Sequence, residues 1–105
     1  MKIVLVGDLF IPGAACTDKL HEIAAPYEAQ CHILDWESAD IEELDRRNMH
    51  VEKDGPSAEL PPARLSILMA DADVLIVHFC PVSQALLESC QRLKVVGTMR
   101  TGLSN

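Results

Sequence analysis

Residues 72–105, ADVLIVHFCPVSQALLESCQRLKVVGTMRTGLSN, decide the fold class. The run Val74–Val77 is continuous, aliphatic and β-branched, which is typical of a parallel strand buried on both faces. Ser83 suits the N-cap of a following helix, and Lys94–Gly97 predicts a second apolar strand. A polar loop follows each strand. Because open parallel sheets bind ligands at the carboxyl ends of their strands, the sequence predicts a site at this edge.

The preceding residues continue this alternation of strands and helices. Strands are predicted at Lys2–Gly7 and, at a sheet edge, Cys31–Leu34. A first helix is predicted from about Ala15, with Thr17 or Asp18 as its cap, and it is expected to kink or end at Pro26. Its expected apolar stripe consists of Leu20, Ile23, Ala24 and Tyr27.

Two further helices are expected between the second and third strands. One has Ser38 or Asp40 as its N-cap and carries Ile41 and Leu44 on its apolar face. Its charged residues are interpreted as a solvated face: Glu42, Glu43, Asp45, Arg46 and Arg47. The other is short, follows Leu60-Pro61-Pro62 and runs through Leu65 and Met69.

The predicted order is β-α-β-α-α-β-α-β. This order predicts a flavodoxin-like three-layer α/β/α sandwich with a parallel sheet of about four strands, in the order 2-1-3-4. We expect the sandwich to be incomplete, since doubly wound sheets of this kind usually have a fifth strand. Residues 1–105 are therefore predicted to be one portion of a domain.

Composition excludes several classes of partner. The net charge of −7 disfavours nucleic acid and anionic membranes, and 4% aromatic residues give no platform for stacking bases. The apolar N-terminal run is too short for a signal peptide or a membrane span, which predicts a cytoplasmic location. The four cysteines form no C-x-x-C pair, so we expect free thiols.

Familiar catalytic motifs are not found in the sequence. No glycine-rich phosphate loop occurs, and Asp8 does not belong to a carboxylate cluster of the phosphoacceptor type. The four histidines lack the spacing of metal ligands, so no metal is expected. Cys80, two residues after His78, is a candidate thiol nucleophile, but no third orienting group is evident and a packed cysteine is the favoured interpretation.

Arg100 is the basic residue at the predicted ligand edge. It comes shortly after the Lys94–Gly97 strand, with Thr101 and Gly102 beside it. A guanidinium and neighbouring backbone N–H groups suit a carboxylate through bidentate hydrogen bonds. A solvated loop arginine is the alternative, and position alone favours neither.

These residues carry a family likeness. The ADVLIV strand, the LKVVG strand and the loop RTGLSN together resemble the N-terminal substrate-binding domain of the D-isomer-specific 2-hydroxyacid dehydrogenases, which are phosphoglycerate dehydrogenase-like proteins. Ser104 stands where many members have Asp. The likeness is good over the last third of the chain.

The resemblance implies a substrate-binding lobe for a small 2-keto or 2-hydroxy acid. The substrate-binding residues that it implies are His78, Phe79, Cys80, Arg100, Thr101 and Gly102. NAD or NADP would bind outside this chain, in a domain encoded beyond Asn105, and this chain would hold no catalytic residue and be inactive alone. A homodimer is expected, because a partial domain exposes apolar surface. The alternative is a stand-alone flavodoxin-like binding or interaction module without catalysis.

Overall fold

Four parallel strands form the centre of the chain, in the order β2-β1-β3-β4. In the computed structural model, which describes residues 1–99, they span Lys2–Gly7 (β1), Gln30–Asp35 (β2), Val74–Val77 (β3) and Val95–Thr98 (β4). Every neighbouring pair is parallel. The predicted flavodoxin-like α/β fold and its strand order are confirmed.

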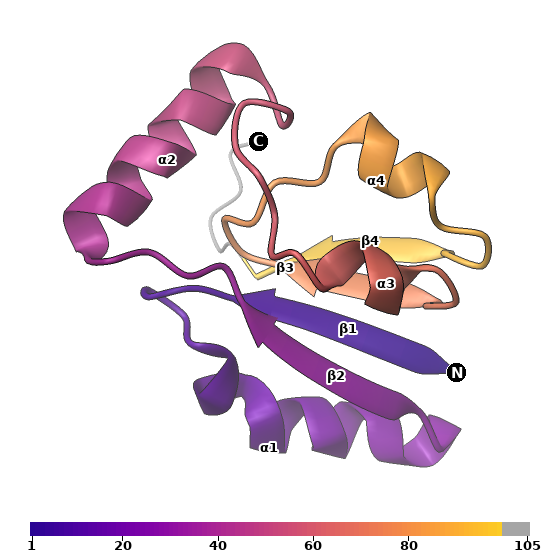
Figure 1. Cartoon of the computed structure of the whole chain (residues 1–105). Helices are drawn as coiled ribbons and strands as arrows, with labels where there is room; N and C mark the ends of the chain where they lie inside the picture. Colours follow the sequence, from indigo (N-terminus) through magenta and orange to yellow (C-terminus); the bar gives the residue numbers. More distant parts are fainter. Residues whose placement is uncertain (100–105) are drawn as a thin grey trace.

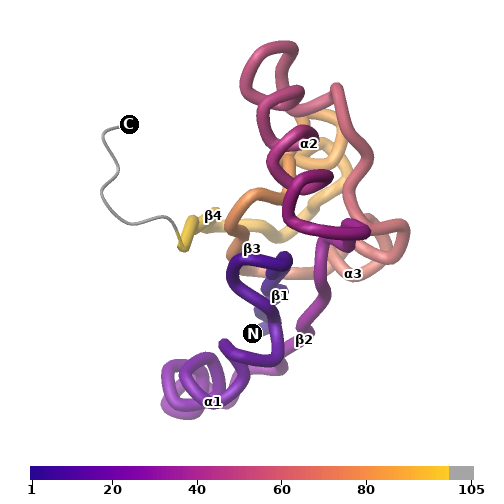
Figure 2. The backbone as a smooth tube through the Cα atoms, turned by 90° about the vertical axis from the view of Figure 1, so that its left-hand side faces the viewer, coloured from indigo at the N-terminus to yellow at the C-terminus, as the bar shows by residue number. Residues whose placement is uncertain are grey.

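Helices cover both faces of this sheet (Figures 1 and 2). Helix α1 (Gly13–Ala24), continued by the 3-10 turn η1 (Ala25–Tyr27), lies on one face. Helices α2 (Ile41–Asp54), α3 (Leu65–Met69) and α4 (Gln84–Glu88) lie on the other. Since side chains alternate along a strand, β1 divides its residues between two cores, with Ile3 and Leu5 toward α1 and Val4 and Val6 toward the other helices.

Helix α1 begins earlier than predicted, and neither Thr17 nor Asp18 caps it. Pro12 occupies the N-cap with an extended backbone, and Gly13 is the first helical residue. A Cβ on Gly13 would lie 2.4 Å from Ile33 Cγ2, so this glycine lets the helix start directly against β2. The predicted apolar stripe of α1 is partly wrong. Leu20 and Ala24 are buried, whereas Ile23 and Tyr27 are exposed. Tyr27 lies in the turn that contains Pro26 rather than on the helix.

Helix α2 begins as the sequence predicts. Asp40 is the N-cap, and its Oδ1 accepts the backbone N–H of Glu43 at 2.8 Å. The fully buried side chains of Leu44 and Trp36 join this helix to the sheet. Gly55 follows the helix with a φ of 96°, which a residue with a side chain rarely adopts.

The two short helices and β4 complete the described chain. Ser83 caps α4 as predicted, because its Oγ accepts the backbone N–H of Leu86 at 3.1 Å. Strand β4 starts and ends one residue later than predicted and lies at the sheet edge. Val95 and Val96 are consequently 54% and 43% exposed.

A buried aspartate joins the amino ends of β1 and β3. Oδ2 of Asp73 accepts the backbone N–H of Lys2 at 2.8 Å, and the Asp73 N–H donates to the Lys2 carbonyl at 2.9 Å. The Lys2 N–H is the main cause that lowers the pKa of Asp73 below its usual range. The two central strands are thus held at the end opposite to the predicted site.

Candidate functional site

The order of the strands brings two polar residues together at the carboxyl edge. Val6 of β1 pairs with Val77 of β3, so the residues that follow the two strands are neighbours. Asp8 is the first residue after β1, and His78 is the first after β3. Although 70 residues separate them in sequence, Asp8 Oδ2 lies 2.8 Å from Nδ1 of His78.

The Asp8 carboxylate is buried and has four hydrogen-bond donors around it. Its side chain is 0% exposed, and that of His78 is 11% exposed. Oδ1 accepts the backbone N–H groups of Phe10 and Ile11, at 2.9 and 3.0 Å. Oδ2 accepts the Phe79 N–H at 3.2 Å in addition to its contact with His78. One side chain therefore connects the turn after β1 to the loop after β3.

The Phe79 ring packs against the face of the imidazole. The His78 and Phe79 rings are stacked, with centroids 3.9 Å apart and planes 29° apart. Phe10 meets Phe79 edge to face, with centroids 5.7 Å apart. The orientation of His78 is thus set both by its hydrogen bond to Asp8 and by ring packing.

A hollow of about 370 Å³ opens beside His78, between the second half of α2 and the ends of β3 and β4. His78, Phe79 and Cys80 line it, and so does Thr98 at the end of β4. From α2, Asn48, Val51 and Glu52 form its wall. Three of the predicted substrate-binding residues therefore share one surface. Arg100, Thr101 and Gly102 lie outside the described residues.

The thiol of Cys80 has low reactivity in this position. The residue is 4% exposed, and burial raises the pKa of its thiol to about 12. A thiol with so high a pKa forms very little thiolate at neutral pH, and thiolate is the nucleophile. The structure supports a packed cysteine over a nucleophile. Cys16, Cys31 and Cys90 are also free thiols.

The turn between β1 and α1 does not fit the phosphates of a dinucleotide. Phosphates bind such turns through free backbone N–H groups at the helix start. Here Asp8 accepts the N–H groups of Phe10 and Ile11, and Asp35 Oδ1 accepts that of Gly13 at 2.8 Å. Carboxylates of the chain itself thus take the place of an anion. We assign no nicotinamide chemistry to this turn.

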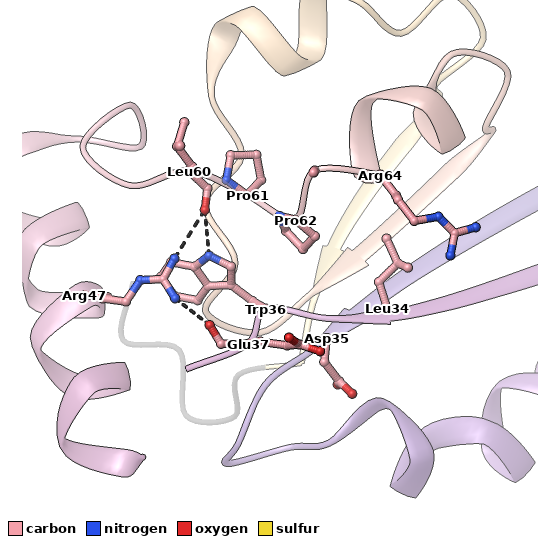
Figure 3. A pocket seen from close by; sticks show the side chains of 10 residues that line it. Leu34, Asp35, Trp36, Glu37, Arg47, Leu60, Pro61, Pro62 and Arg64 are labelled. Carbon is pink, nitrogen blue, oxygen red and sulfur yellow. Dashed lines mark hydrogen bonds between the residues drawn. The ribbon is translucent and has the colours of Figure 1, made fainter. Parts of the chain in front are cut away.

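A larger groove, of about 530 Å³, lies around Trp36 and contains the Leu60-Pro61-Pro62 segment and Arg64 (Figure 3). The polar groups of its two central side chains, Trp36 and Arg47, have partners within the chain: the Trp36 Nε1–H donates to the Leu60 carbonyl at 2.8 Å. Arg47 lies 4.1 Å from the Trp36 ring and donates to the carbonyls of Leu60 and Glu37 and to the Glu59 carboxylate. These contacts hold the segment before α3 in place.

The position of Arg47 corrects the sequence interpretation. Arg47 was expected on a solvated charged face, but its side chain is 18% exposed and clamps the 59–60 segment against Trp36. Periodicity places a residue on a helix face without showing which loop returns over that face. The charged partner of Arg47, Glu59, is 12 residues away in sequence, so i,i+4 spacing gave no signal.

The pairing of Asp8 with His78 was also missed. Sequence reasoning considered Asp8 as a phosphoacceptor and His78 as a partner of Cys80. The strand order 2-1-3-4 held the useful signal, because it makes the ends of β1 and β3 neighbours. The first polar residue after each strand then becomes a candidate partner for the other.

Neither side-chain geometry nor comparison with known proteins assigns a metal or a family. Among residues 1–99, no group of three or more histidine, cysteine or acidic side chains is arranged to hold a metal ion. None of the helices in this range has the length and apolar character needed to cross a bilayer. No protein-family model, curated protein or solved structure matches the chain. The likeness to 2-hydroxyacid dehydrogenases thus rests on the quoted residues and stays a prediction.

Proposed function

We propose that this chain is the substrate-binding lobe of an NAD(P)-dependent D-2-hydroxyacid dehydrogenase, and that the hollow beside His78 receives a small 2-keto or 2-hydroxy acid. One observation carries the proposal. The loop after β3, where the resemblance implies substrate-binding residues, and the end of β4, which contains most of the LKVVG strand, line the same hollow at the carboxyl edge of a parallel sheet.

The chemistry of the hollow suits a small polar ligand. Val51, Val77 and Val82 offer apolar contact, and the imidazole of His78 and the hydroxyl of Thr98 offer polar contact. In the proposed reaction, a hydride moves from C2 of the hydroxy acid to the nicotinamide, and the hydroxyl group loses its proton. We assign neither transfer to residues 1–99, whose proposed role is to bind and orient the acid.

Two further expectations accompany this proposal. We propose that the protein is cytoplasmic and that it forms a homodimer. The edge strand β4, with its exposed Val95 and Val96, supports pairing with a second copy. Light scattering over a range of concentrations tests this state, and a monomer at every concentration would count against it.

Binding is tested by NMR titration of the 15N-labelled chain with pyruvate. We expect amide shifts at residues 78–82 and 95–98, with a Kd on the order of 1 mM, because one lobe supplies only part of a ligand's contacts. Pyruvamide, which lacks the carboxylate, and propionate, which lacks the keto group, are the controls. Equal shifts with pyruvamide, or no shifts with pyruvate at about 50 mM, would refute an acid-binding site.

The dehydrogenase part of the proposal has its own test. The gene is read beyond codon 105 for a G-x-G-x-x-G motif after a predicted strand. The encoded protein is then assayed for oxidation of NADH or NADPH by 2-keto acids. A stop codon directly after Asn105 would favour the alternative, a stand-alone binding module.

A further inference from the structure

The partners of Asp8 determine which nitrogen of His78 carries a proton. At neutral pH an aspartate carboxylate holds no proton and can only accept hydrogen bonds. Nδ1 of His78, 2.8 Å from Oδ2, must therefore be the N–H donor. In the neutral imidazole, Nε2 then has a lone pair and no proton. Nε2 is thus the atom that gains or loses the proton.

Nε2 is the ring nitrogen that Asp8 leaves open. Among residues 1–99 no side chain or backbone group forms a hydrogen bond with it, and the His78 side chain is 11% exposed. The stacked Phe79 ring and the bond to Asp8 leave the imidazole little freedom to turn. Since His78 lines the hollow, a ligand there meets an imidazole whose tautomer is already fixed.

Within residues 1–99, few titratable groups surround His78. Asp8 contacts His78 from the turn after β1, and Glu52 of α2 lines the same hollow. Cys80, from the loop after β3, stays a neutral thiol because burial raises its pKa to about 12. From β4, the hollow is lined by Val96 and Thr98, which do not titrate.

We infer that Asp8 is a positioning residue that makes acid binding at His78 proton-linked. The inference rests on the proposed function, which supplies an acidic ligand. With Nδ1–H directed at Asp8, neutral His78 presents a lone pair that repels a carboxylate. After Nε2 takes one proton from solvent, the imidazolium donates a hydrogen bond to that carboxylate. Where the free imidazole is neutral, one proton is taken up from solvent for each acid bound, and no covalent bond to carbon changes.

The linkage has a measurable consequence. Where the free imidazole is neutral, the affinity for a carboxylate falls about tenfold for each pH unit, and where the imidazole is already protonated the affinity levels off. The variant Asp8→Asn should remove this slope. Its amide oxygen would still accept the N–H groups of Phe10 and Ile11, which turns the amide NH₂ toward His78 and removes the acceptor of the Phe79 N–H. Nδ1 would then accept, Nε2 would carry the proton, and neutral His78 would donate to the acid.

The first experiment measures the tautomer without any ligand. Two-bond 1H–15N correlation spectra of the histidine rings distinguish Nδ1–H from Nε2–H. We expect Nδ1–H in the unchanged chain at neutral pH and Nε2–H in Asp8→Asn. An Nε2–H tautomer in the unchanged chain would overturn the inference whatever the ligand does. Amide spectra verify that the variant is folded, and if it is not, the unchanged chain and His78→Gln decide.

The second experiment measures pyruvate affinity from about pH 5 to about pH 9. The unchanged chain should show the tenfold slope, as should the control His21→Gln, whose histidine is exposed on α1. Asp8→Asn and His78→Gln should show none. A pH-independent affinity in the unchanged chain would overturn the inference and leave the proposed function standing. Absence of binding at every pH would overturn the proposed function, and the ligand step with it.

Discussion

The two central strands are joined at each end by a buried aspartate, and the two ends differ in chemistry. At the amino end, Asp73 accepts the backbone N–H of Lys2, and the nearest cation, Arg92, is 3.8 Å away. At the carboxyl end, Asp8 accepts three backbone N–H groups and also holds His78, which faces a hollow. Burial of a charge therefore does not by itself mark a site. The distinguishing feature is a titratable partner with one atom left for a ligand.

The largest effect is expected at the carboxyl end. Asp8→Ala removes the acceptor for the N–H groups of Phe10, Ile11 and Phe79 in a buried place. Leaving such donors unsatisfied should lower the free energy of unfolding by about 3 kcal/mol. Urea denaturation followed by circular dichroism measures the loss. A loss no greater than that of Asp73→Ala would show that the two buried aspartates contribute equally, and would contradict the difference between the two ends.

A second large loss of stability is expected for Arg47→Ala. This variant tests whether the polar cluster around Arg47 stabilises the fold without binding a ligand. The variant loses the ion pair with Glu59, the contact with the Trp36 ring and the bond to the Leu60 carbonyl. We expect about 2 kcal/mol in the free energy of unfolding. The matched control is Arg46→Ala on the same helix. Arg46 is 75% exposed and 3.8 Å from Glu43, so its loss should stay below about 0.5 kcal/mol.

Pyruvate titration completes this test. Arg47 lies in the Trp36 groove, and it does not line the hollow beside His78. Arg47→Ala should therefore bind pyruvate with unchanged affinity wherever it is folded. A tenfold loss of affinity in the folded variant would mean that the two clusters are coupled and that the clamp is part of the site.

The fold was more predictable than the site for a physical reason. Strands such as Val74–Val77 and caps such as Asp40 and Ser83 are local signals, written in neighbouring residues. The bond between Asp8 and His78 joins residues 70 apart and depends on register. The sequence placed His78 at the carboxyl edge of the sheet because the end of a strand can be located from local residues. Its side-chain partner can be predicted only when the strand order is used to find which loops are neighbours.

Acidic pH should reduce the contribution of Asp73 to the free energy of unfolding. Its pKa is lowered in the folded chain, chiefly by the Lys2 N–H, so Asp73 contributes stability that is fully present above its ordinary pKa of 3.8. That contribution is lost as the pH falls through the lower, folded-state value. The difference in unfolding free energy between the unchanged chain and Asp73→Asn should thus be constant near neutrality and shrink in acid. Urea denaturation at a series of pH values measures it, and a difference that grows in acid would contradict the assignment.

The smallest effect on stability is expected for His78→Gln. Asp8 would keep its three backbone donors, and the glutamine amide can donate in place of Nδ1–H. The free energy of unfolding should change by no more than about 0.5 kcal/mol. A loss close to that of Asp8→Ala would mean that the imidazole is a structural part of the edge, like the Lys2 N–H beside Asp73. A small loss in stability together with a lost pH dependence of pyruvate binding would separate two roles. Asp8 would stabilise the loops at this edge, and His78 would contact the ligand.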